Sequence, residues 1–599
     1  MYFLNWFLNL FNFTNGQVTY LYYDIAIFAI FAAFLLLNIR KIRKYTKIDG
    51  LYFKMLLLLL LAYFLIELFL VTPTHLLYND EWIYASIAKT ILTNHIMGIC
   101  SFSTATYCIP GTAGLFHQPG GWPLLLSAAF YLFGVSFPVG YNLVLLISVI
   151  TVALVFYVTL LLTNNQKVSL LASAIFAFTP LFMTFSRSMI VDIPAAMFEI
   201  FSIFALLLYL RDRSLLSGML TITSIAVTLS MKVDAVIILP VILAIFLLNN
   251  ETFRKRWSSR DTLNIAILII LLFAISLPEI IFLKNSTTIT GPGAFGNISQ
   301  PLFSVGYLEG NFTINTLFWF GRYTNSVMNY NGTNFTYHDE FPFSYTAFAV
   351  IGLAFMLIKK KFRLPAQLFL WFAIVFVFYT SYYGGSVLYS LGDDMRYFLV
   401  AFVPLSISAS LGTIGAYDYI SGKIKPRRKN RSKAKPTKRN SILMIAMLLI
   451  LFSNSAIQFV NVVHASPFTI LPFAAERYDE RLLQATLSQI PENCTIITFQ
   501  PPLWNVLGRA NIYTTWYNLT EYKSAYDNMT RNNCVYFDRS IDCYLDYGGV
   551  NTESECGNFT STHILIPLNT TILNGYTWNN VTLGIYIVAQ NSTQSNTSS

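Results

Sequence analysis

Charged side chains are scarce in this sequence. Of its 599 residues, only 11% are Asp, Glu, Lys or Arg, whereas 55% are hydrophobic. A soluble globular domain carries about 25% charged residues, so the composition excludes an ordinary soluble protein. The net charge of +10 does not indicate nucleic-acid binding, because the basic residues form short clusters between long apolar runs. This pattern is typical of a multi-pass membrane protein with basic cytoplasmic loops, and no nucleic-acid partner is expected.

The N-terminal stretch MYFLNWFLNLFNFTNG lacks the basic region that opens a signal peptide. We therefore expect no cleaved leader, and the first span begins near Tyr22. Apolar runs of about 20 residues mark membrane spans, and the expected fold class is an α-helical polytopic membrane protein. Twelve spans are expected, at 22–39, 51–71, 138–162, 168–186, 193–210, 214–231, 235–249, 263–283, 343–358, 364–382, 397–419 and 441–461.

Basic clusters predict the orientation of these spans. The clusters RKIRK (40–44), RKRWSSR (254–260), KKKFR (359–363) and the long basic run at 423–439 all fall on one side, which the positive-inside rule makes cytoplasmic. Asn-X-Ser/Thr triplets, the acceptors of N-glycosylation, fall on the opposite side except for Asn430. An integral membrane protein of the cell membrane is expected, with its termini and C-terminal segment on the extracytoplasmic side.

The apolar stretch GWPLLLSAAFYLFG (121–134) decides the number of membrane crossings that precede the later loops, and therefore the side on which each of those loops lies. A crossing here would reverse every later loop and place the basic clusters outside. The stretch is also short for a span, which needs about 20 residues. We therefore expect an interfacial or re-entrant helix rather than a thirteenth crossing.

Cysteine is also scarce, and none of the six lies in an expected span. The six are Cys100 and Cys108 in the first external loop, and Cys494, Cys534, Cys543 and Cys556 in the C-terminal segment. This placement predicts disulfides in an oxidising compartment. Cys100 is expected to pair with Cys108, and the remaining four allow three connectivities, which the sequence leaves open. The spacings do not resemble zinc-binding motifs, and no metal site is expected.

Three regions are expected along the chain. An additional N-terminal span with a basic loop occupies 1–49, a transmembrane core with external loops at 72–137 and 284–342 occupies 50–461, and a soluble external α/β domain occupies 462–599. In the last region the periodicity predicts a helix at 479–490 and strands at 494–500 and 563–568. Its Ser-, Thr- and Asn-rich end predicts a disordered, glycosylated tail.

Charged residues at the edges of spans are costly, which makes them functional candidates. The candidates at the external ends are Asp80, Glu81, Arg187, Asp192, Lys232, Asp234 and Arg396. A carboxylate there is suited to accept a proton from an acceptor hydroxyl, and Arg or Lys is suited to hold an anionic phosphate. An aromatic side chain such as Tyr84 is suited to stack on a sugar. The chemistry that this set permits is sugar transfer from a lipid phosphate.

Each candidate also has a plainer interpretation. Asp80 before EWIYASIAKTIL resembles a helix N-cap, and Asp192 two residues before Pro194 resembles a helix start. Lys232 and Asp234 are placed to neutralise one another at a hairpin. The sequence leaves these alternatives open.

Five motifs that follow one another along the chain indicate a protein family more specifically than any single one of them does. They are NDEWIYASIAKTIL, HQPGGWPLLLSAAFYLFG, SRSMIVDIPAAMF, SMKVDAVIILP and GDDMRYFLVAFVPL. Over roughly residues 50–420, the sequence resembles the dolichyl-phosphate-mannose protein mannosyltransferase superfamily, and is similar to the aminoarabinose and related lipid-linked-sugar transferases, all of the GT-C type. The resemblance implies a membrane enzyme that moves one sugar from a polyprenyl (dolichyl-type) phosphate to an external protein, glycan or lipid acceptor. It implies no required cofactor.

The resemblance also implies roles for individual residues. Asp80 is expected to be the catalytic base or to orient the acceptor, with Glu81 beside it and Asp192 as the carboxylate of the second loop. The donor phosphate or sugar is expected at His117, Gln118, Arg187, Lys232, Arg396 and Tyr84. Gln118 stands where some members have Lys, so His117, Lys232 and Arg396 remain alternatives for the residue that binds the phosphate.

Three other functions remain as alternatives. An oligosaccharyltransferase catalytic subunit has a similar layout, and CYLDYGG (543–549) weakly resembles its acceptor motif, but the two tryptophans of that motif are absent. A secondary transporter would carry internal repeats and midplane polar residues, neither of which is evident. A non-catalytic lipid-binding or envelope-assembly protein is the third alternative. The sequence sets neither the sugar, the acceptor class nor the oligomeric state.

Overall fold

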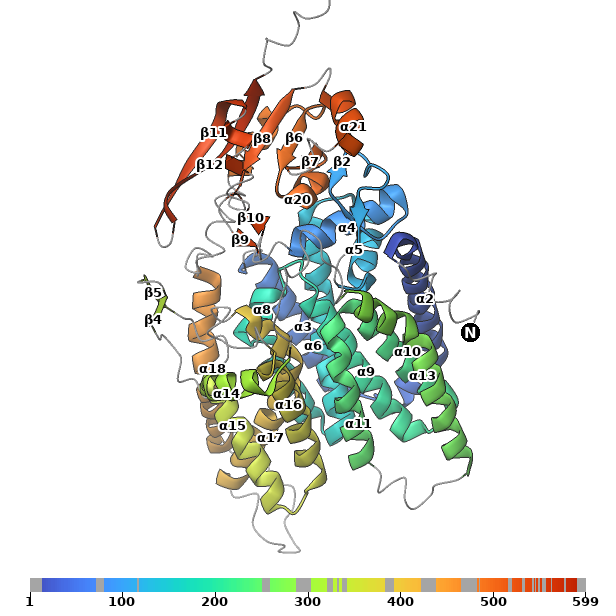
Figure 1. Cartoon of the computed structure of the whole chain (residues 1–599). Coiled ribbons are helices and arrows are strands. Elements are labelled where there is room, and N and C mark those ends of the chain that lie inside the picture. Colours follow the sequence, from blue (N-terminus) through green and yellow to red (C-terminus); the bar gives the residue numbers. More distant parts are fainter. Residues whose placement is uncertain are drawn as a thin grey trace, which may run out of the picture.

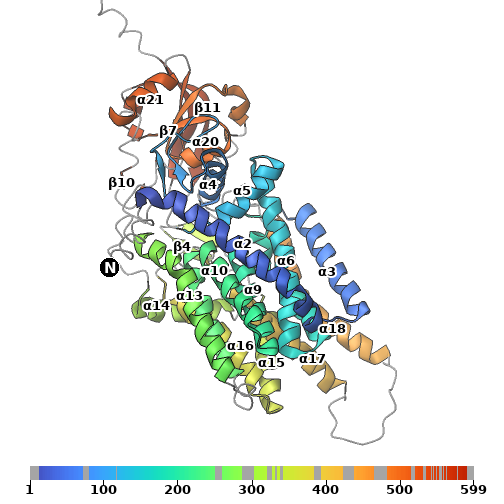
Figure 2. The same cartoon turned by 90° about the vertical axis from the view of Figure 1, so that its right-hand side faces the viewer.

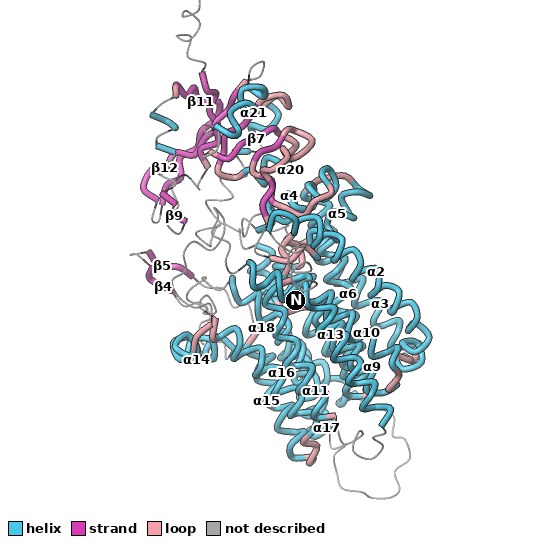
Figure 3. The backbone as a smooth tube through the Cα atoms, turned by 45° about the vertical axis from the view of Figure 1, so that its right-hand side comes forward, coloured by secondary structure: helices cyan, strands magenta, loops and turns pink. Residues whose placement is uncertain are grey.

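Helices form most of the chain up to residue 464, and a β-sheet domain sits at one end of the helical bundle (Figure 1, Figure 3). The structure, a computed structural model, describes residues 13–71, 80–115, 118–249, 259–286, 303–319, 327–330, 333–336, 342–382, 393–421, 438–464 and most of 482–589.

Seven described helices are long and apolar enough to cross a membrane. They are α2 (Phe13–Tyr45), α3 (Gly50–Phe69), α6 (Phe137–Thr163), α9 (Asp192–Asp212), α13 (Ser259–Ser286), α16 (Arg363–Thr380) and α17 (Phe402–Ile420), the last continuing the 3-10 helix η2 (Asp393–Ala401). The chain is therefore a polytopic membrane protein, as its composition predicts. α9 and α17 are largely buried inside the bundle, whereas α2 and α3 expose most of their surface, and α3 lies at the edge in Figure 2.

Shorter apolar helices lie where the other five spans are expected. They are α7 (Gln166–Ala177), α10 (Leu215–Met231), α11 (Ile238–Leu248, after the 3-10 helix η1, Val233–Ile237), α15 (Phe343–Ile358) and the segment Ile442–Ile457 of α18 (Lys438–His464). The total of twelve crossings stays a prediction. Where α15 crosses α17, a Cβ added to Gly352 would lie 1.9 Å from the carbonyl oxygen of Ser408. Glycine is needed here because the two backbones are in direct contact.

The expectation of one helix over 168–186 is wrong. The chain forms α7 and then a separate short helix, α8 (Pro180–Phe185), with Thr179 between them in an extended conformation. Proline disfavours a helical conformation in the residue before it, but its fixed φ suits the first turn of a new helix. The break turns the chain before it reaches Arg187.

The stretch for which an interfacial helix is expected forms α5 (Gly121–Phe133). Thirteen residues rise about 20 Å, which is less than the hydrocarbon thickness of a bilayer. α5 packs on α4 (Asp80–Asn94), and both lie between the bundle and the sheet domain in Figure 1. The interfacial position of α5 stays a prediction.

The C-terminal domain is built on a six-stranded sheet with the order β11-β12-β8-β6-β7-β2. Its strands are β6 (Thr495–Thr498), β7 (Ala510–Tyr513), β8 (Val535–Arg539), β11 (Ile564–Gly575), β12 (Trp578–Ala589) and β2 (Phe102–Ser103). β6 runs parallel to β7 and β8, and the other pairs are antiparallel. The helices α20 (Pro501–Val506) and α21 (Thr520–Thr530) accompany it.

The strands predicted at 494–500 and 563–568 are confirmed as β6 and the start of β11. Of the helix predicted at 479–490, residues 482–483 and 485–489 are helical, Ile490 is extended after the last turn, and 479–481 and 484 lie outside the described residues. The predicted tail after 589 also lies outside them. β2 was not predicted, and it comes from the segment between α3 and α6 (residues 70–136), hereafter loop one.

All six cysteines form disulfides, as predicted. Cys100 pairs with Cys108. The three connectivities left open for the other four resolve to Cys494–Cys534 and Cys543–Cys556. Loop one also contains the short strands β1 (Ile99–Cys100) and β3 (Ala113–Gly114), which pair with each other. Between residues 286 and 342, where an external loop is expected, the structure shows the helix α14 (Val305–Trp319) and the hairpin β4 (Val327–Tyr330) and β5 (Thr333–Thr336).

Candidate active site

The charged candidates come from the ends of helices that meet beside the C-terminal domain. Asp80 lies in the first turn of α4, and Asp192 is the first residue of α9. Lys232 separates α10 from η1, and Arg396 lies in η2. Asp80 and Asp192 do lie at helix starts, as their plainer interpretation predicts. Both residues also belong to a charged cluster.

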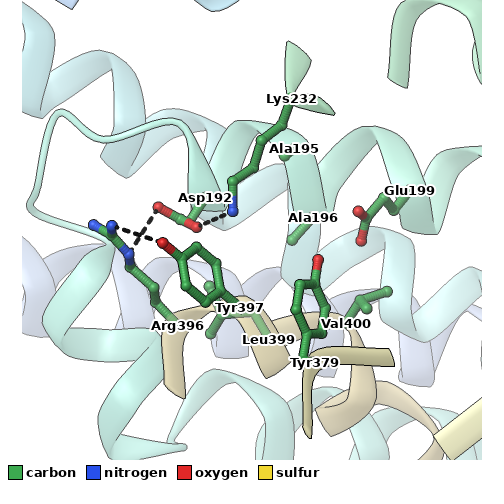
Figure 4. A pocket seen from close by; sticks show the side chains of 10 residues that line it. All are labelled: Asp192, Ala195, Ala196, Glu199, Lys232, Tyr379, Arg396, Tyr397, Leu399 and Val400. Atoms are coloured by element: carbon green, nitrogen blue, oxygen red, sulfur yellow. Dashed lines mark hydrogen bonds and ion pairs between the residues drawn. The ribbon is translucent and has the colours of Figure 1, made fainter. Parts of the chain in front are cut away.

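Lys232 lies between two carboxylates. Its Nζ is 2.9 Å from Asp192 Oδ1 and 2.9 Å from Asp234 Oδ2. The side chains of Lys232 and Asp192 are almost fully buried, at 8% and 4% exposure. Lys232 and Asp234 form an ion pair, as the hairpin interpretation predicts. Asp192 on α9 lies equally close to the Lys232 ammonium group, so the hairpin is not its only source of negative charge (Figure 4).

Arg396 extends this cluster toward Asp80. Its Nε lies 3.6 Å from Asp192 Oδ2, and its Nη2 lies 3.9 Å from Asp80 Oδ2. The side chain of Arg396 is 6% exposed and that of Asp80 is 34% exposed. The ion pairs therefore run from a carboxylate open to solvent at Asp80 to a buried ammonium group at Lys232.

Two tyrosines that were not predicted complete the cluster. Lys232 Nζ lies 4.0 Å above the centre of the Tyr397 ring, a cation–π geometry. Tyr379 stacks on Tyr397 and donates a hydrogen bond of 3.1 Å to Asp234 Oδ2. Tyr397 follows Arg396 in a motif that the sequence had already singled out, whereas nothing in the sequence distinguishes Tyr379 from the other tyrosines of the chain.

Asp192, Lys232, Arg396 and the two tyrosines line a small cleft of about 220 Å³, a volume that includes space open to solvent, whereas Asp80 and Asp234 lie outside its lining (Figure 4). Its lining consists of Asp192, Ala195, Ala196, Glu199, Lys232, Tyr379, Arg396, Tyr397, Leu399 and Val400. Glu199 lies two turns along α9 from Asp192 and is buried at the far side of the cleft from Arg396 in Figure 4. The cleft therefore combines cations, carboxylates and aromatic rings.

The surroundings set the protonation of two groups at this cluster. Burial opposes the charged form of Lys232, but Asp192 and Asp234 more than compensate, so the pKa of Lys232 is raised and the ammonium form persists. Burial raises the pKa of Tyr84, and the negative charges of Asp80 and Asp192 raise it further. Tyr84 therefore keeps its hydroxyl proton beside the two carboxylates.

Glu81 points away from the cleft, although it follows Asp80 directly. Its carboxylate is fully buried and accepts hydrogen bonds from the Ser188 hydroxyl and from the backbone N–H of Met189, the latter at 3.0 Å. Glu81 thus ties α4 to the segment between α8 and α9. It is placed to fix the position of Asp192, not to contact a substrate in the cleft.

The remaining predicted residues lie around the cluster. Arg187 is buried near Glu67, and its Nε and Nη1 have no hydrogen-bond partner among the described residues. Gln118 accepts a 3.3 Å hydrogen bond from the backbone N–H of Val233, next to Lys232. His117 lies outside the described residues. Within the part of the chain that the structure describes, no group of three or more His, Cys, Asp or Glu side chains is placed to hold a metal ion.

Comparisons with known proteins agree with this layout. Residues 117–279 match the family model of dolichyl-phosphate-mannose-protein mannosyltransferases. The fold is similar to that of ArnT from Cupriavidus metallidurans bound to undecaprenyl phosphate, with a TM-score of 0.52 and 11% identity over 91% of this chain and 99% of ArnT. The chain therefore shares its fold with ArnT, and residues 117–279 resemble the dolichyl-phosphate-mannose-protein mannosyltransferases.

Two other solved structures were compared with the chain. The apo form of the same ArnT gives a TM-score of 0.50 and 13% identity over 90% of this chain and 97% of that one. The archaeal oligosaccharyltransferase AglB from Archaeoglobus fulgidus gives 0.48 and 14% identity, covering 83% of this chain and 71% of AglB. No curated protein sequence matches the chain. The resemblance seen in the sequence to GT-C transferases is therefore confirmed.

Proposed function

We propose that this GT-C transferase moves a single sugar from a polyprenyl phosphate to a hydroxyl-bearing acceptor on the extracytoplasmic side of the membrane. The observation that carries the proposal is the series of ion pairs from Asp80 through Arg396 and Asp192 to Lys232. It places a partly exposed carboxylate, suited to an acceptor from outside, next to buried cations suited to a lipid phosphate.

Asp80 has the role of general base in this proposal. The acceptor oxygen attacks the anomeric carbon, the bond from that carbon to the phosphate oxygen breaks, and the acceptor proton passes to the Asp80 carboxylate. The sugar ends on the acceptor, and polyprenyl phosphate leaves as the anion. Arg396 holds the Asp80 carboxylate from one side, which leaves its other oxygen free to face the acceptor.

Lys232 and Arg396 bind the phosphate and stabilise the charge that develops on it. The contacts of Arg396 to Asp80 and Asp192 are long, at 3.9 and 3.6 Å, so a phosphate oxygen can attract the guanidinium group without breaking a short ion pair. Arg187 offers two further buried donors close by in sequence to Asp192. ArnT, which shares the fold, is described as bound to undecaprenyl phosphate, which supports a ligand of this class.

Asp192 positions the two cations. It contacts both Lys232 and Arg396, so the cations keep a fixed spacing before the donor binds. Such preorganisation removes the cost of ordering charged side chains during the reaction. The extracytoplasmic location rests on the basic clusters at the opposite ends of the expected spans and on the disulfides of loop one and the C-terminal domain.

The test is a transfer assay with the purified full-length protein in lipid nanodiscs. A panel of polyprenyl-phosphate hexoses and pentoses is supplied together with hydroxyl-bearing acceptors of three classes, a Ser- and Thr-containing peptide, a glycan and a lipid, and the release of polyprenyl phosphate is measured for the wild type and for Asp80→Asn. Asn keeps the shape but does not accept the proton, so we expect a loss of about 10²- to 10⁴-fold in kcat with unchanged binding of the donor.

Asp212→Asn is the matched control. Asp212 forms an ion pair with Lys41 at the opposite end of the bundle, so its removal takes away one charge far from the cleft and leaves transfer intact. Wild-type turnover in Asp80→Asn would remove Asp80 from the mechanism. The absence of polyprenyl phosphate release from every donor would overturn the proposed reaction. Mass spectrometry of surface glycans from a deletion strain then identifies the sugar that is lost.

A further inference from the structure

α4, the helix that begins with Asp80, is held by the C-terminal domain. Its Trp82 is 2% exposed and packs in the core of that domain with Leu482, Leu503 and Trp504. α20 of the domain lies directly against α4 (Figure 1). Three successive residues of α4 therefore face three different surroundings: Asp80 faces Arg396, Glu81 the segment before α9, and Trp82 the C-terminal domain.

Two further turns of α4 are hydrogen-bonded to one residue of α20. The Asn505 side-chain amide donates a 2.9 Å hydrogen bond to the Ser86 hydroxyl. Lys89 Nζ donates to the backbone carbonyl of Asn505 at 2.6 Å and to that of Ala105 at 3.0 Å. Ser86, Lys89 and Asn505 are almost completely buried, at 0%, 6% and 2% exposure. Hydrogen bonds in such a site are costly to leave unmade.

A strand from loop one reinforces the contact. β2 is the edge strand of the domain's sheet and pairs with β7, with Phe102 opposite Ile512. The Asn511 amide donates to the Ser103 hydroxyl at 2.7 Å, and both residues are fully buried. Loop one is thus attached to the domain through backbone pairing, an apolar core and side-chain hydrogen bonds at once.

From these contacts we infer that the C-terminal domain is part of the catalytic machinery, and that Asn505 is a positioning residue which keeps Asp80 aligned with Arg396. The inference rests on the role proposed for Asp80. Ser86 lies about 9 Å along α4 from Asp80, and α4 is a rigid helix over that distance. A small tilt at Ser86 therefore moves the Asp80 carboxylate away from Arg396, whose contact of 3.9 Å is already long.

The kinetic test uses Asn505→Leu, Ser86→Ala and the double variant in the full-length protein. We expect each single variant to lower kcat by about tenfold or more, because misplacement of a catalytic group by about 1 Å costs up to 10²-fold. The KM for the polyprenyl-phosphate donor stays unchanged, because Lys232 and Arg396 lie on other elements. The double variant should lose no more than the worse single variant, because both remove the same hydrogen bond.

Phe537→Leu is the control for general damage to the domain. Phe537 lies on β8, is fully buried and stacks on Phe559 at 4.5 Å between ring centres, in a different part of the apolar core from Trp82. We expect this variant to lower the melting temperature of the protein as much as Asn505→Leu does, with kcat unchanged. An equal fall of kcat in Phe537→Leu, or additive losses in the double variant, would overturn the positioning role.

Hydrogen–deuterium exchange tests the attachment without reference to transfer. Asn505→Leu should speed amide exchange in residues 80–94 and 102–103 at least tenfold, while exchange in α9 stays unchanged. Unchanged exchange in α4 would overturn the inference even if kcat fell. The two proposals can fail separately. If Asn505→Leu speeds exchange in α4 but Asp80→Asn transfers sugar at the normal rate, the domain holds α4 and Asp80 is not the base.

Discussion

Asp192 and Lys232 form a buried ion pair of 2.9 Å, although they lie on different elements and are 40 residues apart in sequence. Asp192 is the first residue of α9, where the helix dipole favours a negative charge. Lys232 is the residue at which α10 ends and the backbone becomes extended. The pair therefore fixes the angle between two neighbouring helices at the point where the cleft opens.

Removal of one partner of this ion pair should lower the stability of the protein more than removal of both partners. In Asp192→Asn, Lys232 loses one of its two carboxylate partners and Arg396 loses its nearer one, and removal of one partner from a buried ion pair costs about 3–5 kcal/mol. We expect a large fall in the melting temperature of Asp192→Asn, and a partial recovery in Asp192→Asn combined with Lys232→Met. Neither variant should transfer sugar. Additive falls in melting temperature would contradict the coupling of the two charges.

Glu81 should tolerate an amide but not an alanine. Gln at this position keeps an oxygen that accepts the hydrogen bonds from Ser188 and from the N–H of Met189, whereas Ala leaves both donors buried without a partner, at about 1–3 kcal/mol. We expect Glu81→Gln to retain most of the transfer rate and Glu81→Ala to lose it at least tenfold. Inactivity of Glu81→Gln with a normal melting temperature would show instead that the Glu81 carboxylate takes part in catalysis.

Lys89 should make stability depend on pH in the alkaline range. Burial lowers its pKa from 10.5 to about 8, so between pH 8 and 10.5 the unfolded chain binds more protons than the folded chain, and stability rises with pH. Below pH 8 the cost of the buried charge is present in full. We expect the melting temperature of the wild type, relative to that of Lys89→Met, to rise between pH 7 and pH 10.

Lys89→Arg provides the comparison for this measurement, because Arg stays charged throughout the range. Its melting temperature relative to Lys89→Met should not change with pH. A constant difference between wild type and Lys89→Met would show that Lys89 does not lose its proton in this window.

Gly121 should not accept a side chain. A Cβ at this position would lie 2.5 Å from the backbone carbonyl oxygen of Ser230, two residues before Lys232. We expect Gly121→Ala to force α5 and the end of α10 apart, which costs about 1–3 kcal/mol, and to lower donor affinity because Lys232 shifts. Gly114→Ala is the control, since nothing lies within 4 Å of a Cβ there. Equal behaviour of the two variants would contradict the close contact.

The sequence predicted the bundle well because long apolar runs have one stable form in a bilayer. Every backbone N–H and C=O must be satisfied within the segment, which leaves the helix. The error at 168–186 came from length alone, since Pro180 inside the run already indicated a break. β2 could not be predicted, because two residues carry no periodicity and their partner strand lies about 400 residues away.

The charged residues of the site were recognisable because charge beside a membrane is costly. Asp80, Asp192, Lys232 and Arg396 do meet. The orientation of Glu81 was not predictable from its adjacency to Asp80: successive residues on a helix point about 100° apart, so the two carboxylates face different partners. Tyr379 was missed because a tyrosine at the end of an apolar helix is common, and only packing shows that it meets Asp234.

The pairing of β2 with β7 sets an order on biosynthesis. Ser103 leaves the ribosome about 400 residues before Asn511, its hydrogen-bond partner. Domains of a chain fold as they emerge, so loop one is made early, yet β2 lacks its sheet and Ser86 lacks its partner Asn505 until the C-terminal domain has been made and has folded. A nascent or truncated chain therefore has an incomplete loop one, and the contacts that hold α4 form last.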